Sequence, residues 1–135
     1  MCIFCEIINK KIKSDIVYED AYLFAFLDID PLNIGHTLIV PKKHSNNFID
    51  DDIFNKKALS LASKISKILL KKYDGVNIVI NTNEEAGQVL FHTHMHVIPR
   101  IKNDNILSFK KNENNSNNLN TKDEIIKDLK DGLND

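Results

Sequence analysis

The pattern of hydrophobic and polar positions predicts three strands in the first third of the chain, over residues 16–18, 22–27 and 36–40. Each segment is rich in β-branched or aromatic side chains, and polar or glycine-containing turns separate the three. Pro41 follows the third strand directly, so it either ends that strand or places it at a sheet edge.

A different spacing begins after residue 52, where apolar side chains recur at intervals of three and four with Lys, Ser and Asn between them. The apolar positions are Ala58, Leu61, Ala62, Ile65, Ile68 and Leu69. This period predicts an amphipathic helix over residues 53–73 that packs these side chains against a core. The acidic run at 50–52 and the basic pair at 71–72 lie where the helix dipole favours them.

The rest of the pattern predicts two more strands and two short helical segments. The strands are expected over residues 76–80 and within residues 88–99. Residues 2–9 predict a short helical turn or knuckle, and the spacing Thr121-x-x-Glu124 is typical of a capping box that opens a final helix.

Together these elements predict an α+β fold: an antiparallel sheet of about five strands, one main helix packed on it, and an extra C-terminal helix. We assign residues 1–111 to one domain. Residues 112–135 contain an Asn-rich stretch, expected to be a mobile loop over 112–120, and the last helix. They belong either to the same domain or to a mobile tail.

Composition and charge narrow the function classes. The 135 residues carry a formal net charge of −1, with 42% hydrophobic and 27% charged positions, as in ordinary globular proteins. This charge does not favour binding to a nucleic-acid duplex, so phosphate binding is expected in a local pocket. No apolar run reaches the roughly 20 residues of a membrane span, and the N-terminus lacks the features of a signal peptide. We therefore expect a cytoplasmic protein with no membrane partner.

Three of the five histidines, His92, His94 and His96, occupy alternate positions of one predicted strand. Residues two apart on a strand project from the same face, so three imidazoles are expected side by side. Such a face can be simply polar and solvated, or can only chelate a metal. Neutral imidazole can also act as a nucleophile or as an acid and base near pH 7, and its attack on phosphorus would form a covalent phosphoramidate-type intermediate.

The run His92-x-His94-x-His96, preceded by Gly87-Gln88, resembles the motif of the histidine-triad (HIT) superfamily of nucleotide hydrolases and transferases. Other segments resemble the same family, at residues 4–8, 26–29, 33–44 and 81. The resemblance covers roughly residues 2–101, and it is to the bacterial-type, nucleoside-phosphoramidase (Hint-like) branch.

The resemblance implies roles for individual residues. His94 would be the nucleophile that takes the nucleotidyl group from the α-phosphate, His96 would hydrogen-bond the phosphate or leaving group, and His36 would support them from the adjacent strand. The implied nucleotide-binding residues are Asn81, Gln88 and the backbone N–H of Val89 at the phosphate, Asp28 at the ribose, and Ile29, Phe4 and Ile7 around the base.

Several of these residues have structural alternatives. Asp28 can cap the loop that follows it, Asn81 can be an ordinary turn former, and Ile29 can be a core residue. Some family members carry Ser or Thr at the position of Val89, where a hydroxyl reaches the leaving group. Valine at this position leaves the leaving-group preference open.

The pair Cys2-x-x-Cys5 is a weak signal by itself, compatible with reduced thiols, a redox pair or metal ligands. Four Cys and His ligands suit a structural zinc ion. The resemblance implies such a site, made of Cys2, Cys5, His44 and His92. The alternative is two reduced cysteines without metal. No cofactor is expected to be required for catalysis.

The leading functional hypothesis is a hydrolase that cleaves nucleoside 5′-phosphoramidates or related AMP conjugates through a nucleotidyl-His94 intermediate. The alternatives are a dinucleoside polyphosphate hydrolase of the sister branch, a purine-nucleotide-binding protein with vestigial catalysis, and a zinc-binding interaction module. Intact His94, His96 and Asn81 argue against vestigial catalysis, and Asp28 argues against the module. The resemblance also implies a homodimer, and the preference between adenine and guanine stays open.

Overall fold

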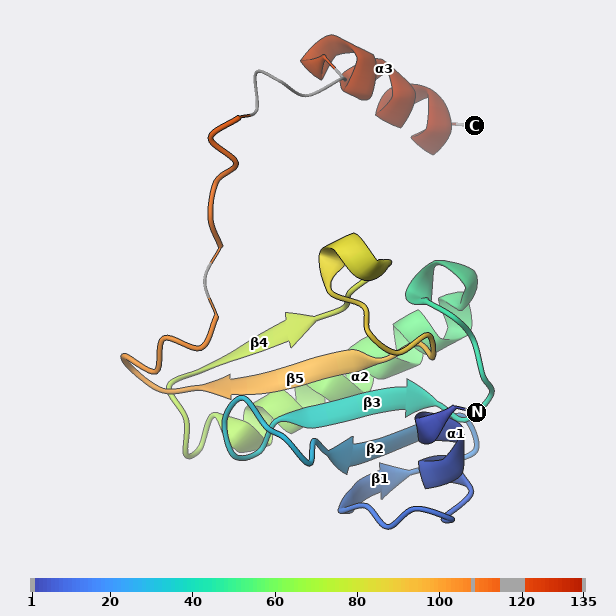
Figure 1. Ribbon diagram of the computed structural model, residues 1–135, viewed down its shortest axis with the longest axis vertical. Coiled ribbons are helices and arrows are strands. Elements are labelled where there is room, and N and C mark those ends of the chain that lie inside the picture. The colour runs from blue at the N-terminus through green and yellow to red at the C-terminus, as the bar shows by residue number, and fades with distance from the viewer. Residues whose placement is uncertain (1, 108, 115–120, 135) are drawn as a thin grey trace. The chain divides into compact units, whose positions relative to one another are not determined.

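The computed structural model describes residues 2–107, 109–114 and 121–134. Its helices and strands are α1 (Ile3–Ile8), β1 (Ile16–Glu19), β2 (Leu23–Leu27), β3 (Thr37–Pro41), α2 (Asp52–Leu69), β4 (Gly75–Val79), β5 (Met95–Arg100) and α3 (Lys122–Leu133), with short 3₁₀ turns η1 (Phe48–Asp50) and η2 (Glu84–Ala86). The predicted α+β architecture is confirmed (Figure 1).

The contacts divide the chain into two units, Met1–Asp104 and Asn105–Asp135. In the second unit, α3 begins with the predicted capping box, in which Thr121 Oγ1 accepts from the Glu124 amide and the Glu124 carboxylate accepts from the Thr121 amide. Most of the predicted loop over 112–120 lies outside the described residues. The assignment of residues 1–111 to one domain stays a prediction.

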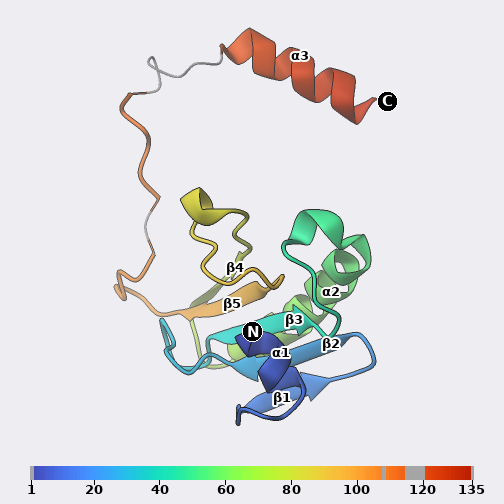
Figure 2. The same ribbon diagram turned by 45° about the vertical axis from the view of Figure 1, so that its right-hand side comes forward.

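The sheet of the first unit has the order β1-β2-β3-β5-β4, and every neighbouring pair is antiparallel. Helix α1 lies on one face of the sheet and α2 on the other (Figures 1 and 2). Strand β2 is buried on both faces because its side chains alternate between the two cores. Leu23 and Ala25 join the core under α2, whereas Phe24 and Phe26 join the core under α1.

Helix α2 confirms the predicted amphipathic period for most of its positions. Phe54, Ala58 and Ala62 are buried, and Leu61, Ile65 and Leu69 pack against the same core. The prediction was wrong for Ile68, which is 63% exposed. At about 100° per residue, Ile68 lies roughly 80° around the helix from Ala58, at the margin of the apolar stripe.

The predicted strand within 88–99 is shorter than expected at its N-terminal end. Strand β5 begins only at Met95, so His92 and His94 lie in the segment before it. The β3–β5 register ends at Ile39↔Met95. Continuing it would bring Thr93 opposite Pro41, which has no amide hydrogen to donate to a ladder.

Gly35 leads directly into β3 and has a φ of 101°, in the left-handed region. A Cβ at this position would lie 3.4 Å from both Leu69 Cδ2 and Pro99 Cγ. We expect Gly35→Ala to lower the free energy of unfolding by at least about 1 kcal/mol, measured by urea denaturation.

Gly75→Ala is the matched control, because its φ is ordinary and its nearest new contact is 3.7 Å away. This variant should stay within about 0.5 kcal/mol of the wild type. Equal stability of the two variants would contradict a strained conformation at Gly35.

Candidate functional site

Three imidazoles gather on the face of the sheet that carries α1. The ring centroids of His94 and His96 are 4.9 Å apart, and those of His36 and His96 are 5.2 Å apart. The intervening Met95 and the following Val97 point into the opposite core, under α2. The alternation expected from the sequence therefore places His94 and His96 on one face.

Hydrogen bonds fix which nitrogen of each imidazole carries hydrogen. The backbone N–H of Leu32 donates to His36 Nδ1 at 3.2 Å, so Nδ1 is unprotonated and the hydrogen of neutral His36 is on Nε2. That Nε2–H faces His96 Nδ1 at 2.9 Å and donates to it. Neutral His96 must then carry its hydrogen on Nε2, as a donor available to a ligand.

His94 has the opposite arrangement. Its Nδ1 lies 2.7 Å from the carbonyl oxygen of His92, which can only accept, so Nδ1 carries the hydrogen. The lone pair of neutral His94 is therefore on Nε2. The site presents one imidazole with a free lone pair next to another with a free N–H.

Burial keeps these imidazoles uncharged. It lowers the pKa of His36 and of His94 below the ordinary histidine value. For His96, burial together with the neighbouring His94 and His36 lowers the pKa to about 4. All three are neutral near pH 7, as the hydrogen-bond chain requires.

A cavity of about 660 Å³ opens beside His96. Four residues predicted to bind the nucleoside, Phe4, Ile7, Asp28 and Ile29, line it, and its other walls are mostly apolar. Ile29 is 98% exposed, so the alternative of a core residue is wrong. The Phe4 ring also packs edge-on against His94, with centroids 5.2 Å apart.

Asp28 makes a local contact as well as lining the cavity. Its Oδ1 accepts from the Asp30 amide at 2.9 Å, which is the loop-capping role considered as an alternative. Its Oδ2 lies 3.7 Å from His36 Nε2 and faces the histidines. One oxygen of the carboxylate thus caps the loop, while the other faces the histidines.

The residues predicted at the phosphate belong to the loop before β5. Gln88 is buried; its Nε2 donates to the Asn46 and Leu90 carbonyls, and its Oε1 accepts from the Asn83 amide. Gln88 thus holds the shape of this loop. Asn81 Nδ2 donates to the Gly87 carbonyl at 3.4 Å, and Val89 is 82% exposed.

Sequence reasoning missed the groups that position the histidines. These are the backbone N–H of Leu32 and a partly buried chain of hydrogen bonds through Thr93, Ser45 and Asp51. Ser, Thr and Asp in loops indicate local turns and helix caps. A contact between residues 48 positions apart, such as Ser45 with Thr93, leaves no pattern along the sequence from which it could be predicted.

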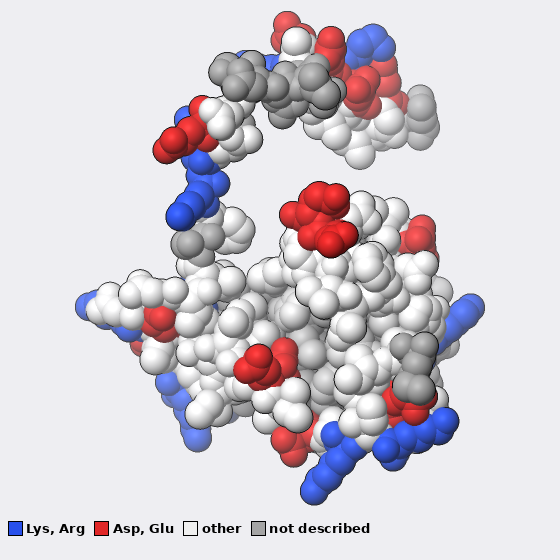
Figure 3. All heavy atoms as spheres, viewed as in Figure 1, with Lys and Arg blue, Asp and Glu red and all other residues white. Residues whose placement is uncertain are grey.

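Positively charged side chains lie mainly at the margin of this face. In Figure 3, which views the face that carries α1, Lys and Arg side chains of the first unit lie around its margin, and its central area is uncharged or acidic. A phosphate bound here would be held by neutral N–H donors.

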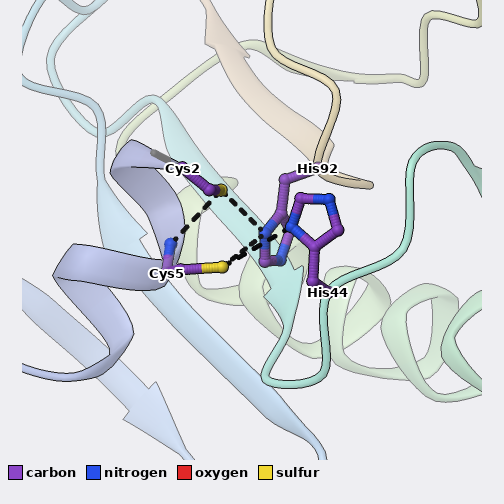
Figure 4. A group of neighbouring side chains, drawn as sticks. All are labelled: Cys2, Cys5, His44 and His92. Atoms are coloured by element: carbon purple, nitrogen blue, oxygen red, sulfur yellow. Dashed lines mark hydrogen bonds between the residues drawn. The ribbon is translucent and has the colours of Figure 1, made fainter.

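Cys2, Cys5, His44 and His92 form a second cluster, in which α1 meets the segment before β5 and the loop after β3 (Figure 4). Cys2 Sγ lies 3.2 Å from His92 Nδ1, and Cys5 Sγ lies 3.5 Å from His44 Nδ1. A tetrahedral zinc ion with ordinary bond lengths needs S···N separations of about 3.5 Å.

The second nitrogen of each cluster histidine also suits metal binding. His92 Nε2 donates to the Pro41 carbonyl at 2.8 Å, and His44 Nε2 donates to Asn46 Oδ1 at 3.3 Å. These bonds leave both Nδ1 lone pairs directed toward the thiols, as in metal sites whose histidines are oriented by carbonyl oxygens. The residues present therefore fit a metal ion.

Asp28, His36 and His96 also lie within mutual ligand distance. However, His36 Nε2 and His96 Nδ1 are directed at each other in a hydrogen bond rather than at a common third point. The Leu32 N–H also keeps the hydrogen on His36 Nε2. His36 and His96 are therefore a hydrogen-bonded pair with Asp28 beside them, not a metal site.

Comparison with known proteins decides the family. A model of the HIT domain matches residues 9–103. The chain belongs to the HIT family. An uncharacterized HIT-like protein of Borreliella burgdorferi is 48% identical over 133 residues, covering 95% of this chain and 92% of that protein. Adenosine 5′-monophosphoramidase HNT1 of Saccharomyces cerevisiae is 40% identical over 100 residues, covering 73% of this chain and 62% of that protein.

Solved structures agree with the sequence relatives. A HIT family protein from Bacillus anthracis superimposes on this HIT protein with a TM-score of 0.83 and 33% identity, covering 98% of this chain and 95% of that one. A Zn-bound histidine triad family protein from Mycobacterium smegmatis has a TM-score of 0.73 and 34% identity, covering 83% of each chain. The family predicted from the histidine motif is confirmed, including its Hint-like branch.

Within the part of the chain that the structure describes, this HIT protein contains no helix with the length and apolar character needed to cross a bilayer.

The lowered pKa of His96 predicts a pH dependence of stability. Its pKa is about 4 in the folded protein and about 6.5 when unfolded. Between these values the unfolded chain binds more protons, so stability falls as the pH falls from 7 to 5, by at most about 1.4 kcal/mol per pH unit for this one group.

Urea denaturation at pH 7 and pH 5 tests this for the wild type and for His96→Gln. Because glutamine does not titrate, the variant should lose less stability than the wild type between the two values. Equal losses would show that His96 is not held neutral by the fold.

Proposed function

We propose that this HIT protein is a hydrolase that cleaves nucleoside 5′-phosphoramidates or related AMP conjugates through a nucleotidyl-His94 intermediate. The observation that carries this proposal is the pairing of a free lone pair on His94 Nε2 with a free N–H on His96 Nε2. The name of the yeast relative, an adenosine 5′-monophosphoramidase, supports the substrate class.

The cavity suits a nucleoside. Its apolar walls, which include Phe4, Ile7 and Leu38, can enclose a purine, and Asp28 lies between the cavity and the histidines. A carboxylate only accepts hydrogen bonds, so Asp28 is suited to the ribose hydroxyls. A nucleoside bound in this way would bring its α-phosphate next to His96 and to the neighbouring His94.

In the first step, His94 Nε2 attacks the α-phosphorus and the phosphorus–nitrogen bond to the leaving amine breaks. The His94 Nδ1–H bond to the His92 carbonyl stabilises the positive charge that develops on the ring. The Nε2–H of His96 donates a hydrogen bond to a phosphate oxygen or to the leaving group. The leaving nitrogen takes up a proton from solvent, and the attacking water returns that proton in the second step. Water then attacks phosphorus and releases AMP and His94, so that one water is consumed for each AMP and amine formed.

We also propose that Cys2, Cys5, His44 and His92 hold a zinc ion. Such an ion would join these four side chains as a structural cross-link and would take no part in the transfer. The ligand distances and the Zn-bound relative from Mycobacterium smegmatis support this assignment. His92 would then attach α1 to the segment that carries the nucleophile.

The charge distribution favours amine conjugates over dinucleoside polyphosphates. A polyphosphate leaving group is strongly anionic, whereas Figure 3 shows Lys and Arg only around the margin of the viewed face of the first unit. The exposed Val89 also provides no hydroxyl to a leaving oxygen. The homodimer stays a prediction.

Release of AMP from adenosine 5′-phosphoramidate tests the proposed activity. The wild type should turn this conjugate over, and His94→Ala should be slower by more than about 1000-fold because the nucleophile is removed. AMP binding, measured by calorimetry, should persist in the variant. A wild type that binds AMP but cleaves neither this conjugate nor diadenosine polyphosphate would be a binding protein.

Metal content tests the zinc proposal. The wild type should carry about one zinc ion per chain, and Cys5→Ser should carry much less and melt several degrees lower. Cys5 is chosen because the Cys2 thiol also caps α1 by accepting from the Cys5 amide, which the variant retains. A wild type that does not bind zinc after reconstitution under reducing conditions would contradict the assignment.

A further inference from the structure

The segment His92–His94 is held differently from the strand that follows it. Strand pairing with β3 ends at Met95, so the nucleophile lies just beyond the regular ladder. Thr93, between the two histidines, is only 1% exposed. Its backbone N–H donates to the Ser45 carbonyl at 2.7 Å, which replaces the missing ladder bond.

The Thr93 N–H and the His92 carbonyl belong to the same planar peptide group. The N–H end of that plane is bound to Ser45, and the carbonyl end accepts from His94 Nδ1. A rotation of the plane would misalign both bonds together. The orientation of the His94 imidazole therefore depends on how firmly Ser45 holds Thr93.

Side-chain hydroxyls reinforce this contact. Ser45 Oγ lies 3.0 Å from Asp51 Oδ2 and 2.7 Å from Thr93 Oγ1. The carboxylate can only accept, so the single hydrogen of Ser45 is donated to Asp51. Thr93 Oγ1 must then donate its single hydrogen to Ser45, whose hydroxyl lies 2.7 Å away and whose carbonyl oxygen lies 3.1 Å away. This gives the chain one direction: Thr93 to Ser45 to Asp51.

The chain ends on a rigid element. The other oxygen of Asp51, Oδ1, accepts from the Phe54 amide at 3.1 Å and caps the N-terminus of α2. Phe54 and Ala58 of this 18-residue helix are buried under the sheet. Hydrogen bonds that end on a charged group are stronger than neutral ones, and this chain ends on a carboxylate.

We propose that Thr93, Ser45 and Asp51 are positioning residues for His94. They orient the 92–93 peptide group so that its carbonyl keeps the hydrogen of His94 on Nδ1 and leaves the Nε2 lone pair free. The inference rests on the proposed function for the step that His94 performs. None of the three is assigned a contact with the nucleotide; they act through the peptide plane.

Thr93→Val tests the proposal because it removes the hydroxyl and keeps the shape of the side chain. Thr93→Ser restores the hydroxyl. Ser66→Ala is the matched control, since it removes a hydroxyl that bonds to the Ala62 carbonyl within α2, away from the chain. If Thr93→Val does not fold, Ser45→Ala removes the hydroxyl that links Thr93 to Asp51, at a partly exposed position, and keeps the backbone carbonyl that Thr93 also contacts.

Two measurements on the full-length, metal-loaded protein follow. Nitrogen-15 NMR of labelled histidine reports which nitrogen of His94 carries hydrogen, and single-turnover kinetics reports the rate of nucleotidyl transfer. Thr93→Val should lose the single His94 tautomer and slow transfer by about 10- to 100-fold, while the Kd for AMP changes less than about twofold. Thr93→Ser and Ser66→Ala should behave like the wild type.

A wild-type tautomer in Thr93→Val, or in Ser45→Ala if it is needed, would overturn the proposal. So would a tautomer change that Thr93→Ser does not reverse. The tautomer is read without turnover, so the outcome is separate from that of the proposed function. A wild type that cleaves no AMP conjugate, yet shows the tautomer change in Thr93→Val, would refute the function and support the positioning role.

Discussion

The antiparallel pairing of β3 with β5 is the interaction on which the site depends. Its register places Leu38 opposite His96, so His36, just before β3, reaches His96 from the neighbouring strand. The same pairing ends at Met95 and leaves His94, the proposed nucleophile, in a segment that other contacts hold. Where the ladder stops therefore decides which histidine is held by a strand and which by a loop.

The proposed phosphate site works with neutral groups. Burial lowers the pKa of His36, His94 and His96, so the imidazoles contribute N–H donors and a lone pair rather than positive charge. Burial already keeps the proposed nucleophile, His94, unprotonated, so no neighbouring cation is needed for that purpose. A cation here would also strengthen binding of the anionic ground state. In the proposed site, directional hydrogen bonds would stabilise the phosphate, while burial keeps the imidazoles neutral.

Much of this could be predicted from the sequence, because it depends on local periods. The alternation of histidines, the helical spacing in 53–73 and the motif that revealed the family are all readable along the chain. The residue at which β5 begins could not be predicted, since it depends on Pro41 in the partner strand. The burial of Gln88 could not be predicted either, because its side chain bonds to Asn46, 42 residues away. The predicted burial of Ile68 was wrong for a simpler reason. This residue lies at the margin of the apolar stripe of α2, and the sheet decides how wide a stripe is covered.

The chain of imidazoles begins at one main-chain group, the Leu32 amide, and His94 is set by another, the His92 carbonyl. Every amino acid except proline supplies an amide hydrogen. The protonation pattern of the site is thus insensitive to the side chain at position 32 as long as the loop keeps its course. Proline is the one residue there that would remove the donor. His36 would then be free to exchange tautomers, and its hydrogen bond with His96 could run in either direction.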